Sequence, residues 1–397
     1  MKQLLIALAL AGLLAGCAES APSAPGSAAG AQPAQAWSVL PLGPGSSLTE
    51  RGFYGSAVID EDAPAVLSFY DFESMAQQVV CDVPGCSHTG EECPASGAGS
   101  LLYRMNDTLL AFGSNADEAY RYIYLRRYDA ESGALLDTRT VLAGWQTVGA
   151  FSDGEFLYAC IEGNLLQMDP ESGLETVVLR NFLPQTQAPL GALNGRVVWQ
   201  TSSDQTNRKA LCLMEDDFSL TEFFQYDESQ SNLLCMDGER LYWADMTTGE
   251  IFSTDAQGTT QTVTKELMSY VWTRPEDGWR NTQIWGGQVV DGKLLVDVLV
   301  QPEDLGATCF AVDLTNGEAV PCTLTDYWNG YAHPVAVWAE TNRGLLVSQH
   351  ERVMRTAMGQ DGGFSTYESA RTLYGFIDAD DFFAGRPEYR MIDSIEI

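Results

Sequence analysis

The chain has few basic residues and very few histidines. Lys and Arg together number 22 against 54 Asp and Glu, only 3 residues are His, and the formal charge at pH 7 is −32. A surface this acidic repels phosphate backbones and anionic lipids, which excludes nucleic acid as a partner and a basic membrane patch. The scarcity of histidine leaves no His-rich metal set. We expect the charge mainly to keep the protein soluble outside the cell.

Long apolar runs and familiar catalytic motifs are also missing. After residue 17, no stretch approaches the roughly 18 uninterrupted apolar residues of a membrane-spanning helix. His333 and His350 are not accompanied by a G-x-S-x-G nucleophile motif, and the glycine pairs do not form a phosphate-binding loop. The sequence therefore favours a non-enzymatic protein, although its many carboxylates leave a glycosidase-type acid–base pair open.

The first residues have the features of an export signal. The opening "MKQLLIALALAGLLAGC" places Lys2 before an apolar run over residues 4–14, which is too short to span a bilayer. The "LAGC" that ends at Cys17 resembles the lipobox of bacterial lipoproteins. This resemblance implies cleavage before Cys17 and acylation of that residue, which would anchor the chain to the extracytoplasmic side of the bacterial membrane.

The next segment has the composition of a flexible tether. Residues 18–36 are almost entirely Ala, Pro, Ser, Gly and Gln, and they offer too little apolar surface to offset the entropy of ordering. The sequence thus predicts three parts: a signal peptide over residues 1–16, a lipidated cysteine with a tether over 17–36, and one folded domain over 37–397.

Two turn motifs alternate along the predicted domain. The first is an Asn-Gly or Asp-Gly pair before a short apolar run, and such a pair supplies the positive φ of a tight hairpin turn. The runs that follow are rich in β-branched and aromatic residues and predict strands. Clear and looser copies start at Arg51, Asn106, Asp153, Asn194, Asp237, Asp291 and Asn342.

The second motif is an acidic residue at a strand end, followed in most copies by glycine. Its carboxylate can accept backbone N–H groups across a turn, while the glycine adopts the left-handed conformation. The copies lie at Asp71, Asp129, Asp169, Asp255 and Asp313, with weaker ones at Asp216 and Gln360. The glycines expected in left-handed positions are Gly133, Gly173, Gly258 and Gly317.

The spacing of the second motif predicts the fold. Seven copies between Asp71 and Asp361 give an average period of about 48 residues. This period predicts an all-β protein, a β-propeller of seven blades with mostly four strands each; six or eight blades, or a pair of β-sandwiches, are the alternatives. Asp129 and Asp313 each follow the preceding copy by 58 residues, and we expect the extra length in loops on the propeller faces. Either residues 37–48 or the tail after residue 370 should close the ring beside the first blade.

Several of these features together resemble a known group of proteins. The export signal, the tether, the stretch "CDVPGCSHTGEECPA", the propeller units and the tail "YGFIDADDFFAGRPEYRMI" resemble surface lipoproteins of clostridial-type gut bacteria. Those proteins carry propeller-like domains of unknown function. The resemblance implies an extracytoplasmic propeller, and it implies no activity and no catalytic residue.

One short loop concentrates possible metal ligands. Cys81, Cys86, His88 and Cys93 offer three thiolates and one imidazole, a complete ligand set for structural zinc. The four residues between the first two cysteines depart from the Cys-x2-Cys of zinc knuckles, so the Pro-Gly pair between them would have to tighten the loop. Because cysteines outside the cytoplasm tend to be paired, we expect a disulfide here ahead of zinc or free thiols, and no other cofactor.

The remaining cysteines are also candidates for disulfide bonds. Cys309 and Cys322 flank a predicted four-residue turn and should face each other across two strands, as a disulfide requires. If two of the three cysteines in the first loop form a disulfide, the third needs a partner elsewhere, which could be Cys160, Cys212 or Cys235. These three residues could equally be buried free thiols.

Aromatic residues in two long connections are the best candidates in the sequence for a ligand-binding site. Rings beside acidic and amide groups can bind a sugar or a peptide, although packing between blades is the expectation we favour. The residues are Trp272, Trp279, Trp285, Tyr327, Trp328 and Tyr331. We therefore expect a lipid-anchored, non-catalytic binding or scaffold module for a glycan, a peptide or an envelope protein. A carbohydrate-active hydrolase or lyase with carboxylates at the propeller mouth, and a structural envelope subunit with an apolar face, are the alternatives.

Overall fold

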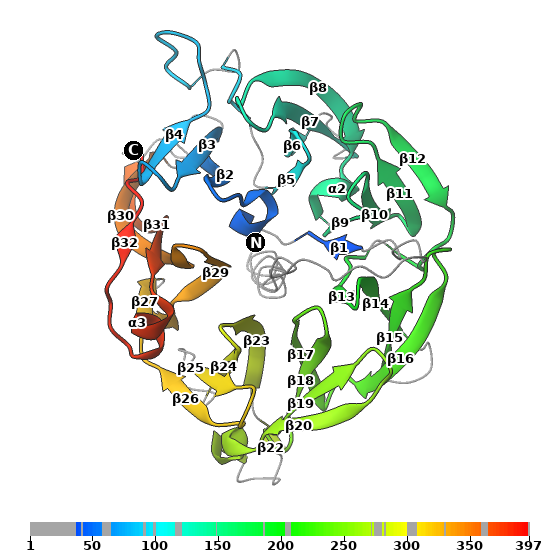
Figure 1. The fold of residues 1–397 in the computed structure, drawn as a ribbon. Coiled ribbons are helices and arrows are strands. Elements are labelled where there is room, and N and C mark those ends of the chain that lie inside the picture. The colour runs from blue at the N-terminus through cyan, green and yellow to red at the C-terminus, as the bar shows by residue number, and fades with distance from the viewer. Residues whose placement is uncertain are drawn as a thin grey trace, which may run out of the picture.

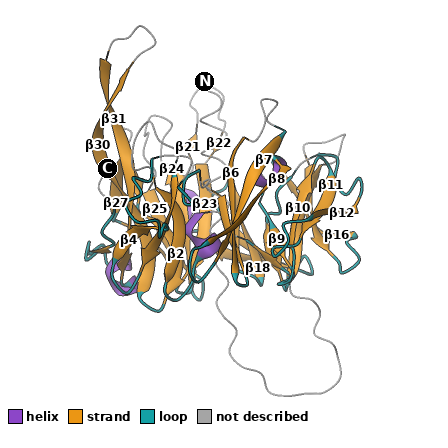
Figure 2. Ribbon diagram, turned by 90° about the horizontal axis from the view of Figure 1, so that it is seen from above, coloured by secondary structure: helices purple, strands orange, loops and turns teal. Residues whose placement is uncertain are grey.

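The computed structural model describes residues 37–40, 43–57, 65–89, 93–97, 101–115, 121–147, 149–185, 187–202, 208–270, 272–273, 280–281, 283–299, 308–328, 331–358 and 364–395. Small antiparallel sheets stand around a central axis and form a ring (Figure 1). Seven of these sheets are the blades of a β-propeller, which confirms the predicted fold and blade number. In the view turned by 90°, the strands stand upright, roughly along the axis of the ring (Figure 2).

The blades follow the chain order. Blade 1 has β2 (Gly52–Ala57), β3 (Val66–Asp71) and β4 (Ala76–Val79), and blade 2 has β5 (Leu101–Met105), β6 (Thr108–Asn115), β7 (Tyr122–Asp129) and β8 (Leu135–Leu142). Blade 3 has β9 (Phe151–Ser152), β10 (Leu157–Ile161), β11 (Asn164–Met168) and β12 (Glu175–Leu179), joined by β1 (Ser38–Val39). Blade 4 has β13 (Gly191–Leu193), β14 (Arg196–Ser202), β15 (Arg208–Met214) and β16 (Leu220–Asp227).

The second half of the ring repeats this plan. Blade 5 has β17 (Ser231–Met236), β18 (Arg240–Asp245), β19 (Ile251–Asp255) and β20 (Thr260–Thr264), and blade 6 has β23 (Gln283–Val290), β24 (Lys293–Leu299), β25 (Thr308–Asp313) and β26 (Ala319–Cys322). Blade 7 has β29 (Ala336–Thr341), β30 (Gly344–Met358), β31 (Phe364–Ile377) and β32 (Arg390–Met391). The other elements are η1 (Gly43–Ser47), α2 (Gly144–Thr147), η2 (Glu266–Tyr270), α3 (Ala379–Phe383) and the two-stranded pairs β21 (Trp272–Thr273) with β22 (Arg280–Asn281) and β27 (Thr325–Trp328) with β28 (Tyr331–Pro334).

Both turn motifs have the predicted place. The Asn-Gly and Asp-Gly pairs join the first and second strands of a blade, and the acidic motif joins the third and fourth strands in blades 2 to 6, so we call them opening and closing turns. In the three-stranded blade 1, the Asp71 turn joins the last two strands, β3 and β4. In a four-stranded antiparallel meander these two turns lie at the same end of the blade. Gly133, Gly173, Gly258 and Gly317 have the predicted left-handed conformation, with φ of 72°, 63°, 80° and 77°.

The carboxylates of the closing turns also act as predicted. Asp129 accepts the backbone N–H of Ser132 at 2.7 Å, and Asp313 accepts that of Thr315 at 2.8 Å. The Ser132 hydroxyl and the Thr315 hydroxyl donate to the same carboxylates. These hydrogen bonds to the charged form lower the pKa of both aspartates below the ordinary value.

The seventh closing turn was predicted at the wrong connection. Gln360 lies outside the described residues, in the segment that joins β30 to β31, the second and third strands of blade 7. The third and fourth strands are instead joined through α3, which starts after Asp378. The acidic and glycine-rich "GQDGG" imitates a closing turn because the same residue types favour any hairpin turn.

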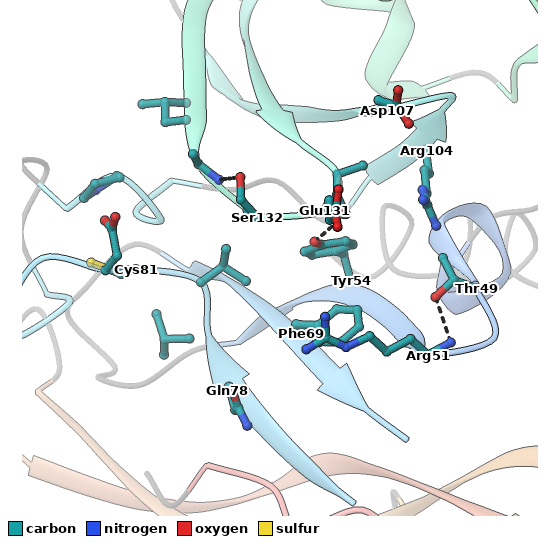
Figure 3. Close-up of a pocket in the computed structure, with 18 of the residues that line it drawn as sticks. Thr49, Arg51, Tyr54, Phe69, Gln78, Cys81, Arg104, Asp107, Glu131 and Ser132 are labelled. Carbon is teal, nitrogen blue, oxygen red and sulfur yellow. Dashed lines mark hydrogen bonds between the residues drawn. The ribbon is translucent and has the colours of Figure 1, made fainter. Parts of the chain in front are cut away.

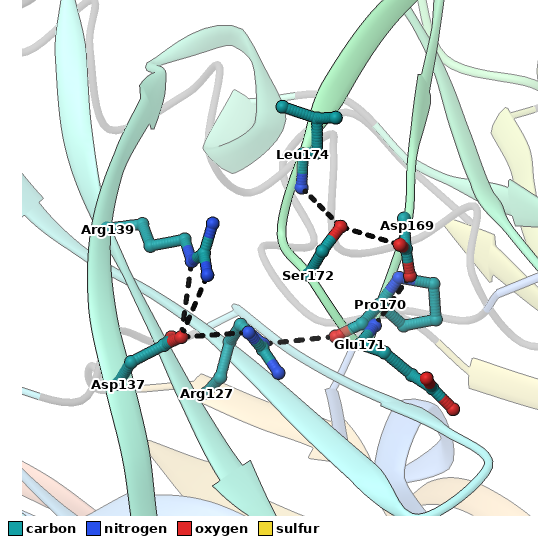
Figure 4. Close-up of polar contacts among 8 residues, drawn as sticks. All are labelled: Arg127, Asp137, Arg139, Asp169, Pro170, Glu171, Ser172 and Leu174. Carbon is teal, nitrogen blue, oxygen red and sulfur yellow. Dashed lines mark hydrogen bonds and ion pairs between the residues drawn. The ribbon is translucent and has the colours of Figure 1, made fainter.

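Neighbouring blades are held together at the closing turns. In Figure 4, Arg127 of blade 2 points toward the closing turn of blade 3, where its Nε donates to the carbonyl oxygen of Pro170 at 3.1 Å. Its Nη1 donates to Asp137 at 2.9 Å, and Arg139 donates to the same carboxylate oxygen. The Arg127 side chain is only 8% exposed, and a buried charge is costly unless it is paired and hydrogen-bonded. The Asp137 carboxylate and the Pro170 carbonyl oxygen supply these partners.

The strand sequences reflect burial between blades. All five residues of β10 are buried, because adjacent blades cover both faces of the sheet. Between blades 1 and 2 the core consists of Tyr54, Val66, Leu67, Cys93, Ala95, Leu102, Leu109, Ala111, Tyr128 and Ala130. This inter-blade core supports the candidate site described below.

The C-terminal tail closes the ring, as one of the two sequence-based expectations proposed. After β32, Asp393 donates its backbone N–H to Met75 at 2.8 Å and accepts that of Gln77 at 2.7 Å, beside the outer strand of blade 1. The N-terminal segment has another role, because Ser38 of β1 pairs with Ser152 of blade 3. In blade 1, η1 precedes the three strands, and within the described residues no strand corresponds to the first strand of the other blades.

Candidate functional site

A cleft of about 970 Å³ lies between blades 1 and 2 (Figure 3). Its volume is in the upper part of the range of small-molecule sites. The side chains that give it chemical character are Arg51, Tyr54 and Phe69 of blade 1 and Arg104, Asp107 and Glu131 of blade 2. Two guanidinium groups, two aromatic rings and several carboxylates thus face one cavity in a chain that is otherwise strongly acidic.

Arg51 is the most accessible cation of this cleft. Its side chain is 66% exposed, and its guanidinium carbon lies 5.5 Å from the centre of the Phe69 ring. Its Nη2 also lies 3.3 Å from a carboxylate oxygen of Asp71. Burial raises the pKa of Asp71, but the backbone N–H groups of Ser74 and Glu73 and the Arg51 guanidinium outweigh this effect and leave the pKa below its ordinary value. Arg51 therefore remains an exposed cation above an aromatic face.

Tyr54 connects the two walls of the cleft. Its hydroxyl donates to the carbonyl oxygen of Ala130 in the closing turn of blade 2, at 2.9 Å. Burial raises the pKa of this hydroxyl, whereas the nearby Arg104 and Arg51 oppose the shift. The hydroxyl is protonated at neutral pH, so this hydrogen bond fixes the floor of the cleft between the blades. Glu131 follows Ala130 and lies next to Tyr54 in Figure 3.

The predicted Cys/His loop borders the same cleft. The Sγ atoms of Cys81, Cys86 and Cys93 and a ring nitrogen of His88 all lie within 4.8 Å of one another. Cys93 is 2% exposed, and the other three residues are half-buried. Burial and the neighbouring thiols raise the pKa of the Cys93 thiol above its ordinary value. Because Cys81 also lines the cleft, the two features are adjacent.

The backbone of the loop brings these side chains together. The backbone N–H of Cys86 donates to the carbonyl oxygen of Val83 at 3.2 Å, and Gly85 between them has φ 76°. Pro84 and Gly85 thus form the tight turn that the spacing requires, as predicted. His88 is also left-handed, with φ 61°, an uncommon conformation for a residue with a side chain.

The predicted cross-strand cysteine pair has the expected register. Cys309 of β25 and Cys322 of β26 are directly opposite each other, and both are buried. Directly opposite residues of antiparallel strands have Cα atoms about 4.5–5.5 Å apart, which suits a disulfide. Both are free thiols here, so the disulfide stays a prediction. Cys17, the predicted lipidation site, lies outside the described residues.

The predicted aromatic residues fall into separate elements. Trp272 belongs to β21 and Trp285 to β23, where it is half-buried, whereas Trp279 lies outside the described residues. Trp328 and Tyr331 are opposite each other in the β27–β28 hairpin.

Tyr327 is the most accessible of these aromatic residues for which the structure describes the side chain. It is 48% exposed, and the guanidinium carbon of Arg352 lies 5.6 Å from its ring centre. Whether these rings bind a sugar or a peptide stays a prediction.

An aspartate–histidine contact in this region was not predicted. Asp326 is 9% exposed and accepts the backbone N–H of His350 at 3.0 Å, while its other oxygen contacts the imidazole Nδ1 of the same residue. His333 is directly opposite Asp326 in the hairpin. Neither histidine accompanies a nucleophile motif in the sequence, so this contact is not indicated by the motifs considered above. The Asn-Gly pair at 329–330 is the sequence signal that would have predicted this hairpin and its pairing.

Comparisons with known proteins identify no relative by sequence. No family model and no curated protein matches the chain. Among solved structures, it is similar to a prolyl endopeptidase (12% identity, TM-score 0.45) over 82% of this chain and 52% of that one, so it spans about half of that enzyme's length. It is also similar to the β-propeller domain of the Trilobed protease from Pyrococcus furiosus (10%, TM-score 0.41; 81% and 93% covered) and to the Dos1 propeller (14%, TM-score 0.42; 87% and 93% covered).

These likenesses concern the fold alone. Within the described ranges, no helix combines the length and apolar character that crossing a membrane requires.

Proposed function

We propose that the protein is a lipid-anchored, extracytoplasmic propeller that works as a non-catalytic ligand-binding module. The observation that carries this proposal is the cleft between blades 1 and 2, where Arg51 and Arg104 face the same cavity as Phe69 and Tyr54. The anchor and the compartment rest on the N-terminal sequence up to Cys17 and on the tether that follows it.

The lining indicates what kind of ligand fits. An exposed guanidinium above an aromatic ring suits a ligand that has an acidic or strongly polar group beside a flat or apolar part. Asp107 and Glu131 on the opposite wall add acceptors for hydroxyl or amino groups. A short peptide or an oligosaccharide with an acidic group combines these features, and the cavity is large enough for several such units.

The lining also supports a non-catalytic role. Thr49, Cys81 and Ser132 supply hydroxyl and thiol groups, but no described residue that lines the cleft is a histidine. His88, which lies beside Cys81 in the Cys/His cluster, has its ring nitrogen 3.5 Å from the Cys93 Sγ, so we do not expect it to activate a nucleophile in the cleft. The carboxylates of the cleft leave hydrolysis of a glycan as the competing function, which the same experiment tests.

The test uses the chain without its lipid anchor, from residue 18 onward, on arrays of acidic glycans and peptides. A retained ligand is then titrated by calorimetry against Arg51→Ala and against Arg180→Ala, which removes an exposed arginine of blade 3 as a matched control. We expect Arg51→Ala to weaken binding at least about tenfold and Arg180→Ala to have no effect, since a charge-assisted hydrogen bond contributes roughly 1.5–3 kcal/mol. Turnover of the ligand, or equal losses in both variants, would refute the proposal.

The anchor is tested separately. In a bacterial host that processes lipoproteins, the wild-type chain should fractionate with membranes and carry acyl chains on Cys17, and Cys17→Ser should release the protein from the membrane. A Cys17→Ser chain that stays membrane-bound contradicts the lipid anchor, whatever the result for the cleft.

A further inference from the structure

We propose that Cys81, Cys86, His88 and Cys93 bind one zinc ion, which fixes the β4–β5 connection and forms part of the wall of the cleft. The site is structural, because three thiolates and one imidazole complete a tetrahedral shell and leave no position for a substrate. Its existence does not depend on which ligand the cleft binds.

The distances fit a tetrahedral zinc shell. With zinc–sulfur and zinc–nitrogen bonds of about 2.3 and 2.05 Å, the sulfur–nitrogen edge of a tetrahedron is about 3.6 Å and the sulfur–sulfur edge is about 3.8 Å. The observed distance from Cys93 Sγ to His88 Nδ1 is 3.5 Å, and all four ligand atoms lie within 4.8 Å of one another. The sulfur atoms therefore need to shift by at most about 1 Å to surround an ion.

The number of thiols argues against a disulfide. A bond between any two of the three cysteines leaves the third thiol within the same cluster. The partners considered for it lie on strands of other blades: Cys160 on β10 of blade 3, Cys212 on β15 of blade 4 and Cys235 on β17 of blade 5. Zinc uses all three thiolates and also accounts for the imidazole, which a disulfide does not.

The exposure pattern of the loop indicates the same role. Asp82, Val83, Pro84, Gly85, Ser87 and Thr89 are exposed, whereas Cys86 and His88 turn toward the cluster. Apart from Cys81 and Cys86, which pack against the core between blades 1 and 2, the described residues 82–89 bury little side-chain surface. A left-handed His88, with φ 61°, orients the ring nitrogen toward the sulfurs, and such a conformation persists only where other interactions stabilise it.

The opposite arm of the loop is already fixed. The backbone N–H of Leu67 in β3 donates to Ala95 at 2.8 Å, and the Tyr128 hydroxyl donates to the carbonyl oxygen of Pro94 at 3.0 Å. Cys93 therefore stands on a rigid segment between blades 1 and 2. Zinc would tie the exposed arm with Cys81 and Cys86 to this segment, and so set the position of one cleft wall.

The experiment measures the zinc content of the full mature chain, purified without chelator in one preparation with reductant and in a second preparation without it. We expect one zinc per chain by elemental analysis and, after exchange with Co²⁺, the visible absorption of a tetrahedral thiolate complex. His88→Ala should weaken zinc binding at least about 100-fold, beyond the 10–100-fold typical of outer-shell changes. Cys160→Ala, which removes a buried thiol of blade 3, is the matched control and should keep one zinc.

Each outcome decides the question. If His88→Ala does not fold, the cobalt spectrum of the wild-type chain still reports the ligand type and the geometry. A chain that contains no zinc in either preparation would overturn the proposal, and a peptide over residues 81–93 that is lighter by two hydrogens in the preparation without reductant would then identify a disulfide. An unchanged zinc affinity of His88→Ala would overturn the proposal as well, because the imidazole would then not be a ligand.

Discussion

Closing turns should contribute more to stability than opening turns, and one blade offers a direct comparison. In blade 6, Gly292 lies in the opening turn with φ 69° and Gly317 in the closing turn with φ 77°. A Cβ atom on Gly292 would meet nothing within 4 Å, whereas one on Gly317 would lie 2.4 Å from the carbonyl oxygen of Val263 in blade 5. Replacing each glycine with alanine therefore applies the same backbone strain with and without a clash against the neighbouring blade.

The expected effects follow from these two surroundings. A left-handed alanine costs about 1–2 kcal/mol, and the lower entropy of its unfolded chain returns about 0.4–1 kcal/mol, so Gly292→Ala should cost roughly 0.5–1 kcal/mol. Gly317→Ala has the same cost from its left-handed backbone, and its Cβ atom must also displace Val263. The next residue, Thr264, donates its hydroxyl to the Gly317 carbonyl oxygen at 2.6 Å, so this displacement also disturbs a hydrogen bond between the blades. Such overpacking adds about 1–3 kcal/mol. We therefore expect Gly317→Ala to cost about 2–4 kcal/mol.

Urea unfolding of both variants and the wild-type chain, followed by tryptophan fluorescence, measures this difference. The unfolding midpoint should fall clearly for Gly317→Ala and slightly for Gly292→Ala, while the denaturant dependence stays the same. Equal midpoints for the two variants would refute the reasoning, because the contact with blade 5 would then contribute nothing beyond the backbone conformation.

Two further predictions concern blade 6. Burial raises the pKa of Asp297 to about 6, so the folded state binds this proton more tightly and stability should fall as pH rises from about 4 to 6, by up to ~3 kcal/mol. In Asp297→Asn, the urea midpoint should therefore change less with pH over that range. Asp313 has a lowered pKa, so its charged form stabilises the fold, and Asp313→Asn should be less stable than the wild-type chain above pH 4. A pH dependence of stability that neither substitution changes would contradict these two pKa shifts. Without reductant, Cys309 and Cys322 should form a disulfide that raises the free energy of unfolding by about 3 kcal/mol. Mass spectrometry should detect it as a loss of two hydrogens, and Cys322→Ser should abolish this loss. A pair that stays reduced without reductant would contradict the prediction.

The ring could be predicted from sequence because its repeating signals are local. The carboxylate of Asp129 and the left-handed Gly133 belong to one turn, and their roles do not depend on the rest of the fold. The prediction failed at blade 7 because Asp378 starts a helical connection there, and a short helix does not share the residue pattern of a tight turn.

The cleft could not be predicted in this way. Arg51 and Arg104 are far apart in sequence; Arg51 directly precedes β2, and Arg104 forms part of β5, an ordinary strand pattern. They share a cavity only because blades 1 and 2 are adjacent and Tyr54 bridges them. The Cys/His loop is an intermediate case, since its spacing indicates a metal or a disulfide but does not choose between them.

The Cys/His loop lies where the repeat is least regular, and the length of the interval marks this place in the sequence. The interval from Asp71 to Asp129 is 58 residues, and its extra length includes the loop from Cys81 to Cys93. Asp313 follows its predecessor by 58 residues too, in the interval that holds β21 and β22. Because residues that keep the period are needed to pack blade against blade, residues that exceed it are available for binding. Deviation from the period therefore marks the Cys/His loop in this chain, whereas Arg51, Asp107 and Glu131 of the cleft belong to the turn motifs that define the period.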